Sequence, residues 1–260
     1  MIQIPVTSIA NLQIGQAQDA AAATGCTVIL CPEGAAAGLD VRGGGPASRE
    51  SELLRPVAAA DKIHAVLLSG GSAFGLDAAG GVMRWLEERG IGFDTGAARV
   101  PLVCASCLYD LTVGSSTVRP GPEMGYAACE NAGNYRDGCH GAGTGASVGK
   151  FRGMGQAMKT GIGSYAVRLG QLEVGAVVAL NALGDVFDWR TGREAAGMLT
   201  PGRDGFLSTE GEMYRSSKVV KNKFVGNTTI GAVVTNARFD KTAMNKIAAM
   251  AQNGMVRAIR

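Results

Sequence analysis

The chain has 260 residues, a net charge of +3, 46% hydrophobic residues and 18% charged residues. This apolar fraction can fill a substantial core, which excludes an intrinsically disordered chain. Basic residues are dispersed apart from Lys218, Lys221 and Lys223, so the composition argues against a nucleic-acid partner.

The N-terminal segment has neither the basic flank nor the apolar stretch of a secretory signal. No apolar run reaches the length of about 18 residues that a membrane helix needs. The cysteines are spread along the chain without a short disulfide framework. We therefore expect a cytoplasmic protein with reduced thiols and no membrane partner. Cys104 and Cys107 lie in an apolar segment, which favours packing over metal or redox roles.

The first half of the chain predicts strands, a loop and a helix. Thr27–Cys31 is an apolar run that we expect to form a buried strand ending at Pro32. Asp40–Ser48 is rich in glycine and indicates a loop. Ala65–Leu68 predicts another strand, and Ala73–Glu88 carries apolar residues at helical spacing.

The second half predicts two more strands and a helix. Val174–Leu180 is apolar without alternation, so we expect it to be buried on both faces. Thr229–Thr235 is a similar strand, and Lys241–Met255 has the spacing of a helix. Buried strands covered by helices indicate a layered α/β or α+β architecture, which we expect to form one domain over residues 1–260.

Familiar catalytic motifs are missing from the sequence. The two histidines, His64 and His140, are too few and too far apart to indicate a metal site, and His64 fits a structural role in an apolar run. The sequence has no nucleophile-elbow motif. Its glycine-rich runs lack the spacing of nucleotide-binding loops. An amide hydrolase of this composition needs a general base of another kind.

A free α-amino group can act as that base, because its pKa is about 7.7–8.0. An N-terminal threonine therefore carries a nucleophile and a base on one residue. Here the polar pair Asn227 and Thr228 runs directly into an apolar strand, where a new terminus would be held rigidly. On these residues alone, a turn that opens a strand is the simpler interpretation.

Longer motifs surround this pair and recur along the chain. Gly226–Gly231 is followed by a Val-Val-Thr-Asn-Ala segment, and the other motifs, in chain order, are Gly38–Gly45, Leu68–Gly81, Leu108–Asp110, Gly145–Lys150 and Val178–Gly184. In this order they resemble the motifs of the self-processing β-aminopeptidases, and Gly226–Gly231 is similar to that family's self-processing site. This family of N-terminal-nucleophile hydrolases includes the L-aminopeptidase/D-esterases and the nylon-oligomer hydrolase. The resemblance covers nearly the whole chain.

The resemblance implies that Thr228 attacks the Asn227 carbonyl in an N-to-O acyl shift, and that ester hydrolysis frees the Thr228 amine. The mature hydroxyl then attacks a substrate amide with that amine as base. Lys150 matches a family lysine whose ammonium favours the deprotonated hydroxyl and amine. Asn181 matches an asparagine whose N–H stabilises the oxyanion, and Tyr109 a tyrosine that lines the site.

Each of these residues also has an interpretation that does not involve catalysis. Lys150 fits a surface lysine in a glycine-rich loop, Asn181 a turn residue after a strand, and Tyr109 a core aromatic. The sequence alone leaves both interpretations open for each residue, and only the resemblance favours the catalytic one.

The implied fold is α+β, a four-layer αββα sandwich with two central sheets between helical layers. Processing would give fragments 1–227 and 228–260. Family members continue past the helix that we expect to end near Met255, with a short acidic motif that orients the amine. We expect this sequence, which ends at Arg260, to lack that segment.

The resemblance further implies a homo-oligomer, often a tetramer, and neither a metal nor an organic cofactor. The expected substrates are small peptides, β-peptides, and amino-acid amides or oligoamides. Two alternatives stay open at this point. One is acyl transfer of the ornithine acetyltransferase type, and the other is a catalytically degenerate binding protein on the same fold.

Overall fold

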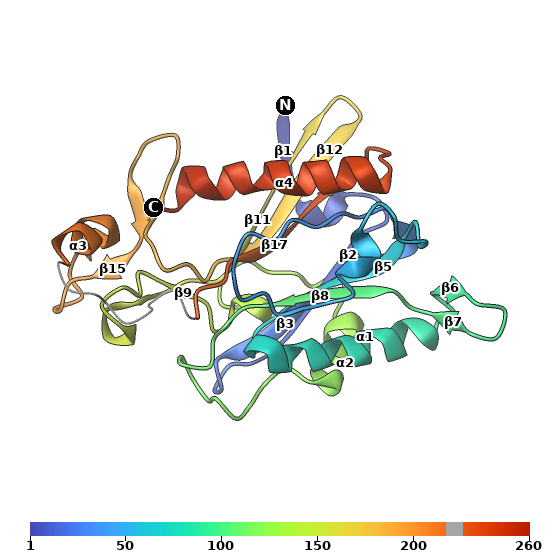
Figure 1. Ribbon diagram of the computed structural model, residues 1–260, viewed down its shortest axis with the longest axis horizontal. Coiled ribbons are helices and arrows are strands. Elements are labelled where there is room, and N and C mark those ends of the chain that lie inside the picture. Colours follow the sequence, from blue (N-terminus) through green and yellow to red (C-terminus); the bar gives the residue numbers. More distant parts are fainter. Residues whose placement is uncertain (217–225) are drawn as a thin grey trace.

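The structure is a computed structural model, and it describes residues 1–216 and 226–260 (Figure 1). The lysines Lys218, Lys221 and Lys223 therefore lie outside the described residues. The chain combines helices with several β-sheets, and the two largest sheets have five and four strands. One sheet has the order β2-β3-β5-β8-β4, and its strands are β2 (Gln13–Asp19), β3 (Thr24–Ala35), β4 (Ser48–Arg49), β5 (Ile63–Ser69) and β8 (Val103–Cys107). The other has the order β1-β11-β12-β17, with β1 (Ile2–Ile4), β11 (Ile162–Leu169), β12 (Leu172–Ala179) and β17 (Ile230–Thr235).

The five-stranded sheet is antiparallel except for the parallel pair β5 and β8. Strand β3 continues through Pro32, so the expectation that it ends there is wrong. Pairing with β2 stops at Leu30, and the pairing with β5 shifts register between Leu30 and Ala35. A proline, which lacks an N–H, is tolerated in such an irregular stretch.

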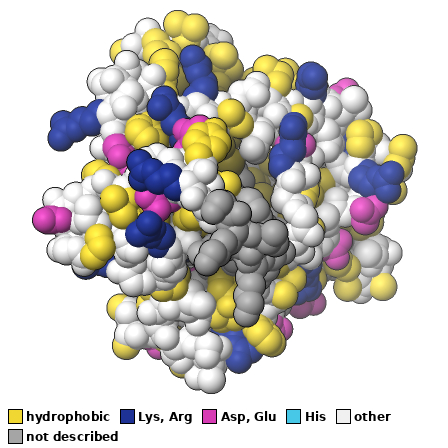
Figure 2. Space-filling view, turned by 60° about the vertical axis from the view of Figure 1, so that its left-hand side comes forward, with side chains coloured by type: hydrophobic (Ala, Val, Ile, Leu, Met, Phe, Trp, Pro, Cys, Tyr) yellow, Lys and Arg dark blue, Asp and Glu magenta, His cyan; other side chains and the backbone are white. Residues whose placement is uncertain are grey.

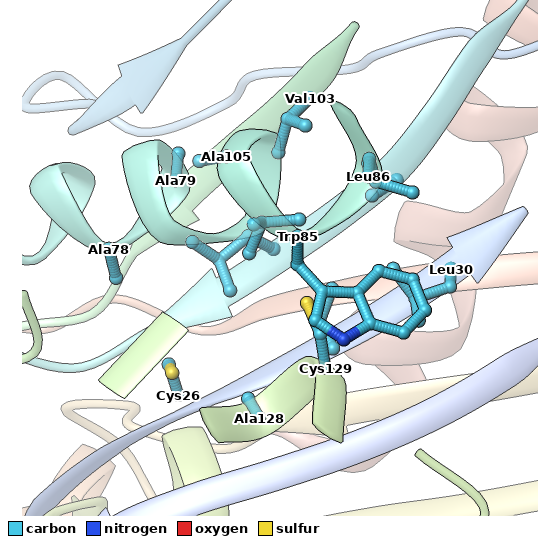
Figure 3. Packing of buried hydrophobic residues seen from close by; sticks show 14 residues of the cluster. Cys26, Leu30, Ala78, Ala79, Trp85, Leu86, Val103, Ala105, Ala128 and Cys129 are labelled. Atoms are coloured by element: carbon cyan, nitrogen blue, oxygen red, sulfur yellow. The ribbon is translucent and has the colours of Figure 1, made fainter. Parts of the chain in front are cut away.

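Two helices, α1 (Ala78–Glu87) and α2 (Pro122–Glu130), cover one face of this sheet (Figure 1). Figure 3 shows side chains of both helices, among them Trp85 and Cys129, packed against Leu30 and Val103 of the strands. The helix expected from Ala73 begins later, because Ser72–Asp77 forms a 3-10 helix before α1 starts.

Glycines allow α1 and α2 to lie close together. A Cβ atom on Gly81 of α1 would overlap the Pro122 carbonyl oxygen, and one on Gly125 of α2 would overlap the Ala78 carbonyl oxygen. The backbones therefore touch where the helices cross, which is a packing reason for glycine inside a helix.

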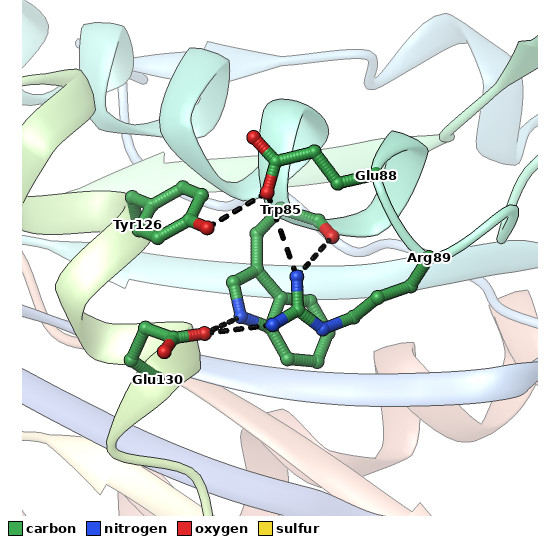
Figure 4. A network of polar contacts seen from close by, with 5 residues as sticks. All are labelled: Trp85, Glu88, Arg89, Tyr126 and Glu130. Atoms are coloured by element: carbon green, nitrogen blue, oxygen red, sulfur yellow. Dashed lines mark hydrogen bonds and ion pairs between the residues drawn. The ribbon is translucent and has the colours of Figure 1, made fainter.

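Polar side chains join the same two helices at the surface (Figure 4). The Arg89 guanidinium lies 3.9 Å from the centroid of the Trp85 ring and donates to Glu130 Oε1 at 2.9 Å. Trp85 Nε1 donates to the same oxygen. The Tyr126 hydroxyl donates to Glu88 Oε2 at 2.7 Å. Because the charged groups Glu88, Arg89 and Glu130 are exposed, their contacts orient the helices more than they stabilise the fold.

The two sheets pack against each other through a second apolar cluster. Ile14, Ile29 and Leu68 contribute from the five-stranded sheet, and Ala166 and Val177 from the four-stranded sheet. The candidate site lies at the ends of strands from both sheets: after β8 of the five-stranded sheet, and after β12 and before β17 of the four-stranded sheet.

Burial alternates along β12, which contradicts the expectation that Val174–Leu180 is buried on both faces. Glu173, Gly175, Val177 and Ala179 are buried, while Val174, between Glu173 and Gly175, is 37% exposed. An apolar run without alternation does not reveal which face is covered, because covering depends on elements elsewhere in the chain.

The last helix, α4 (Lys241–Ala258), is held at both ends. Lys241 Nζ donates to the carbonyl oxygens of Leu53 and Ala58, at 3.1 and 2.8 Å. Ile259, directly after the helix, bridges to Val186. The predicted helix Lys241–Met255 is thus confirmed and extends to Ala258.

The remaining elements are short. They are helix α3 (Thr209–Arg215) and the paired strands β6 (Phe93–Asp94), β7 (Arg99–Val100), β9 (Ser147–Val148), β10 (Met158–Lys159), β13 (Val186–Phe187), β14 (Glu194–Ala196), β15 (Met198–Leu199) and β16 (Phe206–Leu207). Other 3-10 turns are Val6–Ser8, Glu52–Leu54, Gly141–Gly143 and Met154–Gln156.

The histidine and cysteine expectations can be compared with their surroundings. His64 Nδ1 accepts a hydrogen bond from Leu102 N at 3.1 Å, and burial lowers the pKa of His64, so its structural role is confirmed. Cys104 and Cys107 are buried in β8, as packing residues should be. Within residues 1–216 and 226–260, no group of three His, Cys, Asp or Glu side chains is placed to hold a metal ion.

The surface in Figure 2 carries Lys and Arg side chains in several separate places rather than in one basic patch. Among the helices that the structure describes, none has the length and apolar composition to cross a membrane.

Candidate active site

Strand pairing brings the predicted cleavage point opposite Asn181. Strands β12 and β17 are antiparallel, and Ala179 pairs with Ile230. Continuing this register by two residues sets Asn181 opposite Thr228. The Thr228 N–H indeed donates to the Asn181 carbonyl oxygen at 2.9 Å. The ladder therefore extends one step beyond the strands and holds the backbone at Thr228.

Lys150 reaches the same place from the turn after β9. Its Nζ atom lies 2.7 Å from Asn181 Oδ1, 3.1 Å from the Asn181 carbonyl oxygen and 3.3 Å from the Gly226 carbonyl oxygen. Its backbone is anchored by a hydrogen bond from Lys150 N to the Leu183 carbonyl oxygen at 3.0 Å. Gly149 before it has a φ of 66° and leaves no room for a Cβ beside Met198, so glycine is required there.

Burial lowers the pKa of Lys150 from 10.5 to about 7. Desolvation disfavours the charged ammonium, whereas three oxygen acceptors suit its three N–H donors. Near neutral pH both the ammonium and the neutral amine are therefore populated. Such a group can exchange a proton under physiological conditions.

Asn181 is fully buried, and each end of its amide has partners. Besides Lys150 Nζ, its Oδ1 accepts from Ser147 N at 3.1 Å. Its Nδ2 donates to the Tyr109 carbonyl oxygen at 2.8 Å and lies 3.4 Å from the Gly226 carbonyl oxygen. Donors on one side and carbonyls on the other define the orientation of the amide.

Tyr109 takes part in two ways. Its backbone carbonyl receives the Asn181 amide, while its ring covers Gly226, where a Cβ would come within 2.9 Å of Tyr109 Cδ1. Gly226 also has a φ of 88°, a conformation that glycine adopts without strain. The ring and the glycine together set the path of the chain two residues before Thr228.

Sequence reasoning missed two charged residues close to this site, the buried Asp110 and the partly exposed Lys159. Asp110 accepts from Gly71 N at 2.7 Å and from Thr24 Oγ1 at 2.8 Å, and burial raises its pKa. Lys159 donates to the carbonyl oxygens of Thr144 and Ala146, at 2.7 and 3.0 Å. Burial lowers the pKa of Lys159, and the charge of Asp110 opposes that change.

These two charges support both segments that contact Asn181. Asp110 holds the chain next to Tyr109, and Lys159 holds the chain that leads to Ser147. A sequence signal for Asp110 existed, since it ends the Leu108–Asp110 motif. The sequence offered no signal for Lys159, because its partners are backbone carbonyls.

The structure thus brings together all four residues that the sequence singled out, Tyr109, Lys150, Asn181 and Thr228. Such a site suits acyl-transfer chemistry, since a titratable amine and an amide donor lie beside the backbone of a threonine, which carries a hydroxyl.

Comparison with known proteins agrees with this chemistry. The chain is 37% identical to an uncharacterized aminopeptidase of Mycobacterium leprae, over 98% of this chain and 74% of that protein. It is 34% identical to the 6-aminohexanoate-oligomer endohydrolase of an Agromyces species, over 96% of this chain and 68% of that protein. The protein is accordingly a hydrolase of the aminopeptidase and amidase class.

A match to a family model is more specific. The model of peptidase family S58 matches residues 5–260, and the chain belongs to that family. The L-aminopeptidase D-Ala-esterase/amidase of Ochrobactrum anthropi, described as a variant of the Ntn-hydrolase fold, superposes with a TM-score of 0.68 at 14% identity. That match covers 100% of this chain and 71% of the other. The resemblance stated from the motifs is therefore confirmed.

Proposed function

We propose that the protein cuts its own chain between Asn227 and Thr228 and then hydrolyses amides with Thr228 as an N-terminal nucleophile. The observation that carries the proposal is the placement of Thr228 against Asn181. The Thr228 N–H donates to the Asn181 carbonyl oxygen at 2.9 Å, and Lys150 Nζ lies 2.7 Å from Asn181 Oδ1. The Thr228 backbone is therefore paired with Asn181, and a titratable amine and a buried amide lie beside that pair.

The first step needs a base other than an α-amine, because Thr228 has no free amine before cleavage. Lys150 suits that task, since burial lowers its pKa to about 7 and leaves much of it neutral. The Thr228 hydroxyl loses its proton and attacks the Asn227 carbonyl carbon. The C–N bond breaks, the nitrogen takes a proton, and an ester to Thr228 Oγ1 remains. Water then hydrolyses the ester and releases fragments 1–227 and 228–260.

The mature site carries out the same chemistry on a substrate amide. The Thr228 hydroxyl attacks the amide carbon while its own amine accepts the proton, and that proton passes to the leaving amine. Water hydrolyses the acyl-enzyme in the second half of the reaction. The Lys150 ammonium favours the neutral form of the Thr228 amine, because a nearby positive charge lowers the pKa of an amine.

The Gly226 carbonyl oxygen suggests where a substrate oxygen would lie. It is 3.3 Å from Lys150 Nζ and 3.4 Å from Asn181 Nδ2, so two N–H donors converge on it. Cleavage after Asn227 would free that segment and leave both donors available. Two donors aimed at one oxygen suit a tetrahedral oxyanion, which supports the role proposed for Asn181.

The substrate class follows from the relatives. One is an aminopeptidase and another an endohydrolase of 6-aminohexanoate oligomers, so we include small peptides, β-peptides, and amino-acid amides or oligoamides in the proposal. We also propose the four-layer αββα arrangement, with α4 in the second helical layer. The homo-oligomeric state and the cytoplasmic location stay predictions.

Mass spectrometry and N-terminal sequencing of the purified protein test self-cleavage. The expected small fragment begins Thr-Thr-Ile-Gly. Replacing Thr228 by Val keeps the shape of the side chain and removes the hydroxyl, so the chain should stay intact. A Thr228→Val chain that is still cut at this bond would exclude Thr228 as the attacking group.

Thr229 provides a matched control next to the proposed nucleophile. Its Oγ1 is buried, and within the described part of the chain it has no hydrogen-bond partner. Thr229→Val should therefore leave cleavage unchanged. The mature protein should release free amine from amino-acid amides. An assay with acetyl-ornithine and an amine acceptor measures acyl transfer, and faster transfer than hydrolysis would favour the acyltransferase alternative.

A further inference from the structure

A cleft separate from the residues around Thr228 lies between β4, the start of α1 and the start of α2. Its volume is about 810 Å³, which is within the range of small-molecule sites. Its walls combine two arginines, one carboxylate and apolar surface. The lining residues are Ser48, Arg49, Ala73, Phe74, Leu76, Asp77, Thr117, Arg119, Pro120 and Gly121.

The guanidinium of Arg119 is held in place and still has free donors. It lies 3.8 Å from the centroid of the Phe74 ring, and its Nε donates to the Ser116 carbonyl oxygen at 2.8 Å. Its terminal nitrogens form no ion pair with a carboxylate in residues 1–216 and 226–260. A guanidinium fixed by stacking in this way can present two parallel N–H donors to a ligand.

Arg49 brings a second guanidinium from the edge strand β4. Its Nη2 lies 3.1 Å from Met83 Sδ, a weak acceptor. It too has no carboxylate partner in the part of the chain that the structure describes. Two half-buried arginines from separate segments therefore face one cleft without a direct ion pair to a carboxylate, which favours an anionic ligand.

Asp77 limits how negative that ligand can be. It lines the same cleft, and its Oδ2 lies 4.0 Å from the position that a Cβ on Gly121 would take, next to the first residue of α2. Its charge offsets one arginine, so the cleft has a net charge of about +1 from these three side chains. The Asp77 carboxylate disfavours a second negative charge on the ligand next to it and attracts an ammonium group.

Between the charged groups the wall is apolar. Phe74 is 58% exposed, and Ala73, Leu76 and Pro120 line the cleft beside it. A short hydrocarbon chain could lie on this surface while its charged ends meet the arginines and Asp77. The pattern of cation, apolar wall and anion matches a molecule with a carboxylate at one end and an amine at the other.

We propose that this cleft binds a small amino carboxylate, with its carboxylate on Arg49 and Arg119 and its ammonium on Asp77. The ligand has two sources. It is either the carboxylate end of a substrate or product of the hydrolysis proposed above, in which case this part rests on that proposed function, or a separate amino acid that binds beside the reaction.

Calorimetry on the full-length protein tests binding without any assay of hydrolysis. The probe is 6-aminohexanoate, compared with hexanoate, hexylamine and inorganic phosphate. We expect 6-aminohexanoate to bind, and Arg119→Gln or Arg49→Gln to weaken it about tenfold or more, since each removes a charge-assisted hydrogen bond. Asp77→Asn should weaken 6-aminohexanoate but not hexanoate.

A matched control is Arg190→Gln. Arg190 also lies over an aromatic ring, 5.1 Å from the centroid of Trp189, but it does not line the cleft. It should leave binding unchanged. Equal binding by Arg119→Gln and the unaltered protein would overturn the proposal. So would undetectable binding of 6-aminohexanoate at millimolar concentration, or tighter binding of phosphate.

Kinetics separates the two sources of the ligand. If the cleft holds the far end of a substrate, Arg119→Gln raises KM for oligoamides with a free carboxylate and leaves end-capped oligoamides unchanged. If it holds a separate molecule, added 6-aminohexanoate changes the rate on capped substrates in the unaltered protein but not in Arg119→Gln. Either result supports the cleft. A protein that never cuts itself would refute only the hydrolysis, and the calorimetric result would stand.

Discussion

Lys150 Nζ lies 2.7 Å from Asn181 Oδ1, and this contact joins two turns that follow different strands, at the point where the chain enters β17. Since Lys150 Nζ also contacts the carbonyl oxygens of Asn181 and Gly226, one side chain contacts both the chain just before the proposed cleavage site and the residue that pairs with Thr228. The arrangement makes Lys150 the strongest test of the proposed chemistry.

Replacing Lys150 by Met should stop self-cleavage. Methionine keeps the length and the apolar stem but has no group to accept or donate the proton, and general acid–base catalysis is worth about 10²–10⁴-fold in rate. Gel electrophoresis and intact mass over several days would show an uncut chain. Lys246→Met, on the exposed side of α4, is the matched control and should be cut at the normal rate. Normal cutting of the Lys150→Met chain would remove Lys150 from the mechanism.

The lowered pKa of Lys150 should appear in the pH dependence of stability. The group titrates at about 7 in the folded chain and near 10.5 when unfolded. Between these values the unfolded chain binds more protons, so the contribution of Lys150 to the free energy of unfolding rises with pH. Below pH 7 the group is protonated in both states, and its contribution stops changing.

Urea unfolding at about pH 7 and about pH 9.5 measures this contribution as the difference between Lys150 and Lys150→Met chains. Both chains should carry Thr228→Val, so that neither is cut. We expect the Lys150 chain to gain stability relative to the Met chain as the pH rises. Parallel pH profiles would mean that the amine keeps its ordinary pKa in the folded protein.

Asp110 is expected to matter for both stability and cleavage, although it does not touch Thr228 in any contact described above. Asp110→Asn keeps the shape, and its oxygen can still accept from Gly71 N, but its NH2 then faces Thr24 Oγ1, and the Thr24 hydroxyl hydrogen loses its acceptor. A buried unsatisfied group costs about 1–3 kcal/mol. We also expect the substitution to displace the neighbouring residue Tyr109. Self-cleavage should then be slower, because the Tyr109 carbonyl oxygen accepts a hydrogen bond from the Asn181 amide.

The control for this variant is an exposed aspartate with a similar local role. Asp94 accepts from Gly96 N at 2.8 Å at the surface, so Asp94→Asn should change the free energy of unfolding little and leave the cleavage rate unchanged. Urea unfolding in the Thr228→Val background gives the stability effect, and the time course of cutting in the otherwise unaltered chain gives the rate. If Asp110→Asn is destabilised yet cut normally, Asp110 supports only the fold.

The four candidate residues could be predicted because each belongs to a motif that resembles one of the family's motifs. The sequence did not single out Ser147, although that residue lies in the Gly145–Lys150 motif. It could not predict the role of Lys159, since the partners of that side chain come from segments that meet only after the sheets have packed. Ser147 N contacts Asn181, and Lys159 binds the backbone of Thr144 and Ala146. Every residue has a backbone carbonyl, so the residue type does not indicate which carbonyl a side chain will contact.

The interiors of strands could be predicted from local sequence, whereas their limits and their exposure depend on tertiary contacts. Apolar runs identified parts of β3, β5, β12 and β17. The length of β3 beyond Pro32 depends on a register shift against β5, and the exposure of Val174 depends on what covers β12. Both are tertiary properties. The late start of α1 is another, because a Cβ on Gly75 would overlap the Gly70 carbonyl oxygen at the end of β5.

Replacing either of two neighbouring glycines of α1 by alanine should change the free energy of unfolding, but in opposite directions. A Cβ on Gly81 would overlap the Pro122 carbonyl oxygen, whereas one on Gly80 would have only Pro122 Cγ near it, at 3.9 Å. Gly80→Ala should stabilise the protein by about 0.5–1 kcal/mol through helix propensity. Gly81→Ala should destabilise it by about 1–3 kcal/mol, because α2 must move away. Urea unfolding in the Thr228→Val background measures both. Stabilisation by both substitutions would mean that the helices are not in backbone contact. The packing of the cluster between these helices and the sheet would then also differ from that described here, because Trp85 and Cys129 of the two helices belong to it.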